Sequence, residues 1–148
     1  MIAKELRIGN WVKCKTNDGC KFGKICDILD IGYFAVRCDG VEYRGKFGGI
    51  GVDIENVEPI ELTNELLENL GFQLTDKPIV NTDLRLSPHF VYRKSIENTH
   101  IDIDPVQLFI LQTGIGNGNM VNIRDVRHLH QIQNAYYMVT GEELNIEL

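Results

Sequence analysis

The first part of the chain, residues 1–62, contains short stretches in which apolar and polar residues alternate with period two. Turn-forming residues separate these stretches, as at Asn17-Asp18-Gly19 and Asp39-Gly40, and such residues favour tight hairpins. The pattern predicts strands over residues 11–15, 24–29, 33–38, 41–47 and 58–62. Short strands linked by tight turns are typical of an SH3-like small β-barrel. The barrel by itself indicates no function, because such folds serve unrelated activities.

The second part, residues 63–148, combines helical and strand patterns. Thr63 precedes a stripe of leucines that ends at Gly71, which predicts a capped helix. A pattern with period 3.6 predicts a longer helix over residues 125–140. Alternation predicts strands over residues 89–94, 99–103, 106–112, 120–124 and 143–148, and residues 75–88 are loop-prone. The expected fold is α+β, with an SH3-like barrel module at 1–62 and an antiparallel sheet with two helices at 63–148.

The chain lacks the sequence features of a membrane or exported protein. Its apolar runs fall short of the roughly 20 residues that a membrane-spanning helix requires. The N-terminal segment mixes Lys4, Glu5 and Arg7 into its few apolar residues, unlike a signal peptide. We therefore expect a cytoplasmic protein with no membrane contact.

All four cysteines lie in the first quarter of the chain, at Cys14, Cys20, Cys26 and Cys38. Their spacing lacks the close C-x2-C pairs of zinc ribbons and fingers, and disulfides are typical of exported proteins. We expect reduced thiols that pack as small apolar residues, and no metal ion or other cofactor.

The charge of the chain is −6, which argues against whole-surface attraction to nucleic acid. Residues 1–61 contain nine Lys or Arg against ten Asp or Glu, whereas residues 62–148 contain six against eleven. The first 24 residues nevertheless carry a local excess of positive charge, with Trp11 as a stacking group. A nucleic-acid-binding face is therefore one alternative, formed by Lys4, Arg7, Trp11, Lys13, Lys15, Lys21 and Lys24.

Strand geometry places His100, Asp102 and Asp104 on one face of a predicted strand. An imidazole and two carboxylates in this arrangement can bind a divalent metal or transfer protons. The alternation with Ile101 and Ile103 is also typical of a half-buried strand with one face in water. We expect the solvated face, and the sequence indicates no catalytic residue.

Two glycine-rich stretches, residues 46–51 and 113–119, are candidates for anion-binding loops. Neither contains the Lys and Ser/Thr of a phosphate-binding loop, and a strand pattern follows the second. We expect residues 113–119 to be a hairpin connection.

The long predicted helix carries a polar row beside its apolar stripe. His130, Gln133, Asn134 and Tyr137 follow at i, i+3, i+4 and i+7. Such a row can hold a small polar ligand, pair with a second copy of the helix, or hydrogen-bond the protein's own loops, and we favour the last two roles. With Arg124 and the 113–119 loop, the same row is the candidate site of a small-molecule or nucleotide-binding protein.

Three motifs resemble those of a set of small uncharacterised proteins of gut Bacteroidetes and their phages or mobile elements. They are Glu5-Leu6-Arg7-Ile8-Gly9-Asn10 at the start, Pro59-Ile60-Glu61-Leu62-Thr63 with Leu67-Glu68-Asn69-Leu70-Gly71-Phe72 at the junction, and His130-Gln131-Ile132-Gln133-Asn134-Ala135-Tyr136-Tyr137 with Thr140-Gly141-Glu142-Glu143-Leu144 near the end. The resemblance implies a short intracellular protein from a phage or integrated element, and it implies no activity or cofactor.

Taken together, these features favour a non-enzymatic binding or interaction protein that forms homo-oligomers. The acidic second part suits a basic protein partner, because complementary charge steers encounter. The nucleic-acid and small-molecule functions remain as alternatives.

Overall fold

The computed structural model describes residues 5–30, 34–39, 41, 51–75, 91–103, 107–112 and 120–147, and it shows an α+β fold. The chain forms two compact units. The first comprises Met1–Glu61 with His128–Ala135 and Leu148, and the second comprises Leu62–Arg127 with Tyr136–Glu147. The boundary therefore crosses helix α2 (Leu129–Thr140).

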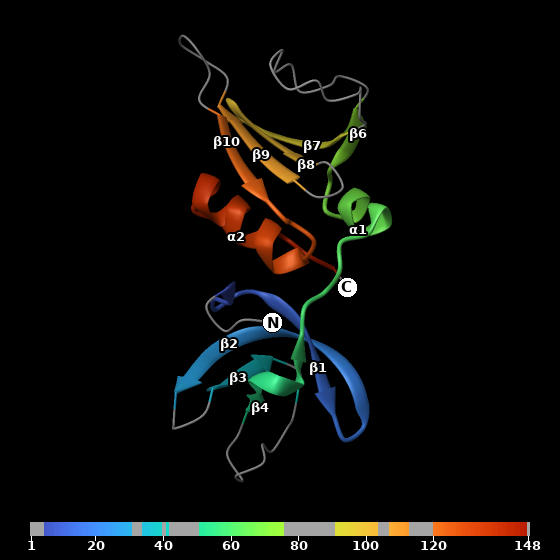
Figure 1. Cartoon of the computed structure of the whole chain (residues 1–148), viewed down its shortest axis with the longest axis vertical. Helices are drawn as coiled ribbons and strands as arrows, with labels where there is room; N and C mark the ends of the chain where they lie inside the picture. Colours follow the sequence, from blue (N-terminus) through green and yellow to red (C-terminus); the bar gives the residue numbers. More distant parts are fainter. Residues whose placement is uncertain are drawn as a thin grey trace. The chain divides into compact units, whose positions relative to one another are not determined.

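The first unit contains a nearly closed antiparallel β-barrel, as the sequence predicts. Its elements are β1 (Trp11–Thr16), β2 (Gly19–Asp30), β3 (Phe34–Asp39), β4 (Val52–Asp53), the 3-10 helix η2 (Ile54–Asn56) and β5 (Val57–Glu58). The strand order is β4-β3-β2-β1-β5. Strand β2 pairs with both β1 and β3, and its register shifts between Ile25 and Asp27. Such a bulge bends a strand, and Figure 1 shows the curvature of β2. The SH3-like barrel is confirmed.

The core of the barrel follows from strand alternation. Val12 and Cys14 are buried on β1, while their odd-numbered neighbours are not. The buried cluster consists of Leu6, Val12, Cys14, Ile25, Val36, Cys38, Val52 and Val57. At about 25 cal/mol per Å² of apolar surface, removal of this surface from water is the main force that closes the barrel.

Several barrel elements differ from the sequence prediction. The expected strand at 24–29 is the second half of the longer β2, and β5 is shorter than the expected strand at 58–62. The expected strand at 41–47 lies outside the described residues except for Val41. Strand β4 and helix η2 went unpredicted, because two or three residues are too few to show a period.

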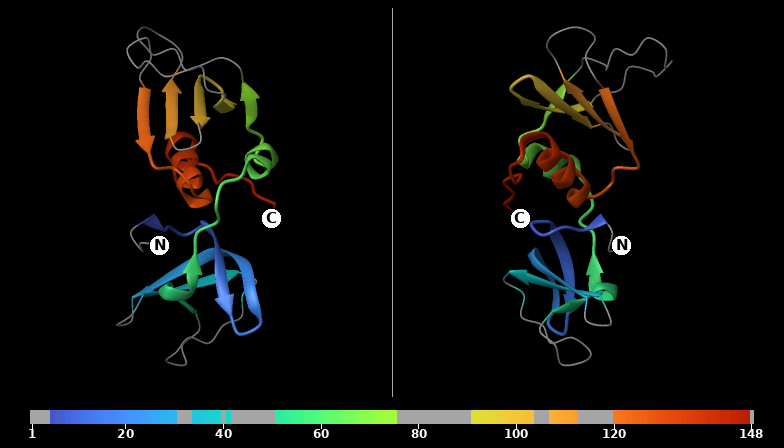
Figure 2. Two further views of the ribbon diagram at one scale, coloured as in Figure 1. Left: turned by 45° about the vertical axis from the view of Figure 1, so that its right-hand side comes forward. Right: turned by 90° about the vertical axis from the view of Figure 1, so that its left-hand side faces the viewer.

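The second unit is an antiparallel sheet with helices on one of its faces. The strands are β6 (Gln73–Thr75), β7 (Val91–Ile96), β8 (Thr99–Ile103), β9 (Gln107–Gln112) and β10 (Met120–Arg124), in the order β10-β9-β8-β7-β6. Tyr92 of β7 hydrogen-bonds Glu68 of α1 (Asn64–Asn69). Lys94, on the same face, lies 5.9 Å from the ring centroid of Tyr136 in α2. Both helices therefore cover this face, as Figure 2 shows.

Helix α1 begins and ends as its sequence predicts. The Thr63 hydroxyl accepts a hydrogen bond of 3.1 Å from the Leu66 amide, which satisfies one of the unpaired donors of the first turn. Gly71 follows the helix with φ of +79°, a conformation that glycine adopts without steric cost. The Lys94 ammonium donates a hydrogen bond to the Leu70 carbonyl and so satisfies an acceptor that the end of the helix leaves unpaired.

The last predicted strand, at 143–148, is wrong. The described residues 143–147 form no strand pairing, although Leu144 and Ile146 are buried between exposed neighbours. Alternation of apolar and polar residues indicates that one side of an extended segment is buried. A segment can be buried on one side without pairing with a strand of a sheet. The long helix also begins four residues later than predicted, because Asp125 has a φ of +59°, outside the helical region, and His128 pairs with Glu61 in an isolated β-bridge before the helix starts.

Candidate functional site

The outward face of the β1–β2 hairpin gathers aromatic and basic side chains. On β1, the buried Val12 and Cys14 point into the barrel, so Trp11, Lys13 and Lys15 point to the opposite side. None of these three residues is buried. Strand β1 thus presents one ring and two ammonium groups outward.

Strand β2 adds a second ring and a third ammonium group to this face. Lys24 pairs with Trp11, and Phe22 pairs with Lys13, and directly opposite residues in an antiparallel pair point to the same side. Phe22 is 50% exposed, which is unusual for so large an apolar side chain. We call Trp11, Lys13, Lys15, Phe22 and Lys24 the ribbon face. Its rings and cations alternate across the two strands.

Acidic residues lie at both edges of the ribbon face, Asp39 of β3 beside Lys24 and Glu58 of β5 beside Lys13. Glu58 of β5 pairs in register with Lys13, and its carboxylate lies 2.5 Å from the Lys15 ammonium. The contact raises the pKa of Lys15 and lowers that of Glu58, so both groups stay charged at neutral pH. Both groups are well exposed, and such pairs contribute little to stability. The pair orients Lys15 and leaves Lys13 and Lys24 beside the rings.

The other basic residues of the sequence-derived set lie elsewhere or outside the described residues. Lys21 pairs with the inward-facing Cys14, which places it on the side of the hairpin opposite the ribbon face. The Arg7 side chain donates to the Asn134 side chain at 2.8 Å. Lys4 lies outside the described residues. The sequence analysis did not include Phe22. Its place on the ribbon face follows from the strand register, which pairs it with Lys13.

The polar row of α2 bonds the N-terminal segment of the first unit. The Gln133 amide donates to the Gly9 carbonyl at 3.1 Å and accepts from the Trp11 amide at 2.9 Å. Asn134 accepts from Arg7 and Asn10, and it donates to the Glu5 carbonyl. Of the roles open to the row, the structure shows the internal one for these two residues.

The third residue of the row, His130, is fully buried without a hydrogen bond. Neither of its ring nitrogens has a partner among the described residues. Its Nε2 lies 3.6 Å from the Glu5 carboxylate, too long for a hydrogen bond, and its ring stacks on that of His128. Burial lowers the pKa of His130, and the neighbouring carboxylate opposes this shift only in part.

The depressed pKa of His130 predicts a loss of stability in mild acid. The unfolded chain takes up a proton near the ordinary pKa of about 6.5, whereas the folded chain binds it only at lower pH. The free energy of unfolding should therefore fall as the pH drops below about 6.5, by at most about 1.4 kcal/mol per pH unit for one proton. Urea denaturation at successive pH values measures this slope.

The His130→Phe variant tests the assignment of this slope to His130. In this variant the free energy of unfolding should fall less steeply as the pH drops below neutral. In the His128→Asn variant, which removes the half-exposed imidazole of His128 and keeps His130, the slope should be retained. An equal slope in His130→Phe and in the parent chain contradicts the assignment.

The remaining candidates of the small-molecule alternative lie apart from this network. Tyr137 is 43% exposed on α2 in the second unit. Arg124 is the last residue of β10, and the described residues do not include its side chain. Residues 113–119 are likewise outside the described part of the chain.

The expectation of a solvated face at His100 and Asp102 is wrong for Asp102. Its side chain is fully buried, and it accepts two hydrogen bonds from Arg93 of β7, at 2.7 and 2.6 Å. The Nδ1 atom of His100 lies 3.0 Å from the Ser95 hydroxyl. Each candidate thus bonds a neighbour on β7, and Asp104 lies outside the described residues.

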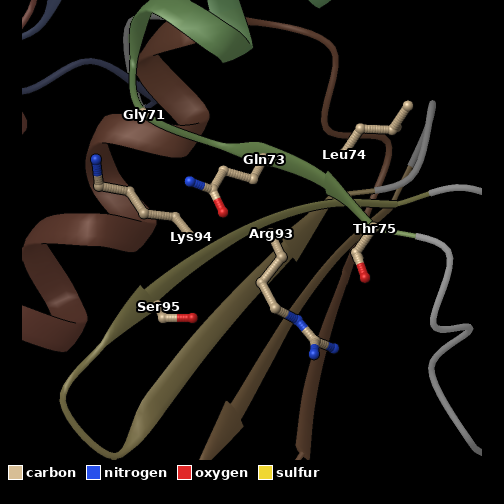
Figure 3. Close-up of a pocket in the computed structure, with 7 residues that line it drawn as sticks. All are labelled: Gly71, Gln73, Leu74, Thr75, Arg93, Lys94 and Ser95. Carbon is tan, nitrogen blue, oxygen red and sulfur yellow. The ribbon is translucent and has the colours of Figure 1, made fainter.

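A cavity of about 410 Å³ lies beside β6 and β7. Its lining residues are Gly71, Gln73, Leu74, Thr75, Arg93, Lys94 and Ser95 (Figure 3). Figure 3 shows Arg93 and Lys94 leaving β7 in different directions. Arg93 binds Asp102, and Lys94 binds the Leu70 carbonyl. Both cations of the lining are therefore engaged in contacts within the unit.

Two further properties concern metals and membranes. Within the described ranges, no three His, Cys, Asp or Glu side chains come together as a metal site. Among the helices of the described residues, none is long and apolar enough to cross a bilayer.

Comparisons of the chain with models of protein families, with curated proteins and with solved structures find no match.

Proposed function

We propose that the protein is a non-enzymatic binding protein that binds single-stranded nucleic acid across the ribbon face of its barrel. The observation that carries this proposal is the alternation of two partly exposed rings with three lysines on two paired strands. The resemblance of the sequence to proteins of Bacteroidetes phages and mobile elements supports an origin in such an element.

The chemistry of the ribbon face suits unpaired bases and phosphates. Each base that stacks on an aromatic side chain contributes about 1–3 kcal/mol, and unpaired bases expose the ring faces that a duplex hides. Lys13 and Lys24 pair in register with Phe22 and Trp11, so their ammonium groups can reach the phosphates between stacked bases. Stacking of this kind tolerates any sequence, because every base has a flat aromatic face.

The charges around the face limit the affinity and make it dependent on salt. The chain carries a net charge of −6, and Asp39 pairs in register with Lys24. Binding therefore depends on a few local phosphate contacts, whose contribution weakens as salt rises. We expect moderate affinity at low ionic strength and a steep loss toward physiological salt.

Trp11 is the single tryptophan of the chain, and its fluorescence reports on the ribbon face directly. We expect a mixed-sequence oligonucleotide to quench this fluorescence at about 50 mM salt. The Phe22→Ala variant, which loses one stacking surface, should bind about tenfold more weakly, within the range of one base stack. The Lys13→Glu/Lys24→Glu variant should lose still more affinity, and its salt slope should decrease by about 1.4, the contribution of two single-strand phosphate contacts.

The Lys21→Glu variant is the matched control. It makes one Lys→Glu change, where the double variant makes two, on the same hairpin but on the side opposite the ribbon face. It should retain most of the affinity that Lys13→Glu/Lys24→Glu loses. Absence of quenching and of any anisotropy change with a labelled oligonucleotide at low salt contradicts the nucleic-acid proposal.

A further inference from the structure

Two cysteine thiols face each other inside the barrel. The Sγ atoms of Cys14 and Cys38 lie 3.6 Å apart, and both residues are buried and reduced. They come from β1 and β3, strands that are not neighbours, because β2 lies between them in the sheet. Only the curvature of the barrel brings them together, so their contact is a product of the fold.

A glycine on β2 makes room for this contact. Gly23 is buried, and a Cβ atom placed on it would lie 2.7 Å from the Cβ of Cys38. That distance is shorter than real carbon contacts allow. The absence of a side chain at Gly23 therefore lets Cys38 lie close against β2.

The two thiols differ in acidity, which gives them different chemical roles. The contact with Cys38 lowers the pKa of Cys14, although burial opposes it. The same contact, together with burial, raises the pKa of Cys38. Since the thiolate is the reactive form of cysteine, the lowered pKa favours Cys14 as the nucleophile of the pair, with Cys38 as the resolving thiol.

We propose that Cys14 and Cys38 form a redox pair, which a peroxide oxidises to a disulfide that joins β1 to β3 inside the barrel. The Cys14 thiolate attacks one oxygen of hydrogen peroxide, the O–O bond breaks, and Cys14 becomes a sulfenic acid while hydroxide leaves. The Cys38 sulfur then displaces the hydroxyl group from the Cys14 sulfur. Two thiols and one peroxide give one disulfide and two waters, and a dithiol reductant reverses the change.

The disulfide would act on strand β1, which carries three of the five residues of the ribbon face. Cys14 lies between Lys13 and Lys15 on β1, so a bond to β3 holds this strand from its buried side. Burial should make oxidation slow, because peroxide must enter a closed core. This inference does not depend on the proposed nucleic-acid binding, since it concerns only the two thiols.

The test uses a variant in which the pair is the only source of thiols. Cys20 is exposed and Cys26 is partly buried, and the Cys20→Ser/Cys26→Ser variant removes both. After treatment with hydrogen peroxide, we expect an intact mass lower by about 2 Da, the two hydrogens lost in forming a disulfide. Alkylation in denaturant should then modify neither cysteine, and dithiothreitol should restore modification of both.

The Cys14→Ala/Cys26→Ser variant is the matched control with two thiols. It keeps Cys38 in the core and Cys20 on the outer side of β2, so it should form no intramolecular disulfide under the same treatment. Two alkylatable thiols in the peroxide-treated Cys20→Ser/Cys26→Ser variant, or a gain of oxygen mass without loss of hydrogen, would overturn the proposal.

Discussion

Replacement of Arg93 by methionine should lower the free energy of unfolding by about 3–5 kcal/mol, the cost of leaving one charge of a buried pair without its partner. Asp102 is fully buried, whereas Arg93 keeps about a quarter of its side-chain surface exposed. The carboxylate therefore depends on the two guanidinium hydrogen bonds. Urea denaturation of the parent chain and of Arg93→Met measures the difference.

Removing the carboxylate as well should restore much of this loss. In Arg93→Met/Asp102→Leu both charges are replaced by apolar side chains, and such replacement of a whole buried pair is often neutral or stabilising. We expect the double variant to be clearly more stable than Arg93→Met. If the two variants are equally unstable, the loss comes from packing around Arg93 and not from the uncompensated carboxylate.

The Gly23→Ala variant should destabilise the barrel by about 1–3 kcal/mol, the usual effect of overpacking a filled core. The new methyl group would lie 2.7 Å from the Cβ of Cys38 and 2.8 Å from a methyl carbon of Val41. The Cβ of Cys38 is fixed to the backbone of β3 and cannot rotate away, so β2 and β3 must move apart. Thermal and urea denaturation report the change.

Coupling with Val41 separates crowding from a general effect of alanine at this position. Val41→Ala removes one of the two groups that the new methyl meets, so Gly23→Ala/Val41→Ala should be less unstable than the sum of the single variants. Residues in contact show such non-additivity, whereas distant ones do not. Strict additivity would argue that Gly23 tolerates a side chain and that the short distances are relieved at no cost.

Local patterns predict the strands of this protein well, because burial on one face leaves a period-two trace in the sequence. The strand expected at 99–103 and the strand expected at 120–124 have the bounds of β8 and β10. The same trace misleads at residues 143–147, where Leu144 and Ile146 are buried without strand pairing. Hydrogen bonding to a neighbour is a property of the fold and leaves no local period.

The composition of the ribbon face depended on register. The sequence analysis grouped the N-terminal cations by proximity along the chain, so it included Lys21 and omitted Phe22. A two-residue turn at 17–18 pairs Thr16 with Gly19, which places Phe22 opposite Lys13 and sends Lys21 to the other side. The sequence alone shows that Lys21 and Phe22, as consecutive residues of a strand, point to opposite sides. The length of the turn decides which of the two lies on the ribbon face.

The partners of the polar residues could not be read from spacing. Helical periodicity placed Gln133 and Asn134 on one line, but their bonds go to residues more than 120 positions earlier in the chain. Likewise, alternation placed Asp102 on the face opposite Ile101 and Ile103, and only the pairing with β7 brings Arg93 to it. Long-range contacts of this kind depend on the topology.

The bonds from α2 to the start of the chain have a consequence for biosynthesis. The Gly9 carbonyl and the Trp11 amide both bind Gln133, so these two backbone groups find their partner only after the ribosome has added more than 120 further residues. A nascent chain that carries all five strands still lacks these bonds. The barrel is thus completed only when helix α2 has been made, and termination of synthesis between β5 and α2 would leave its N-terminal segment without these two bonds.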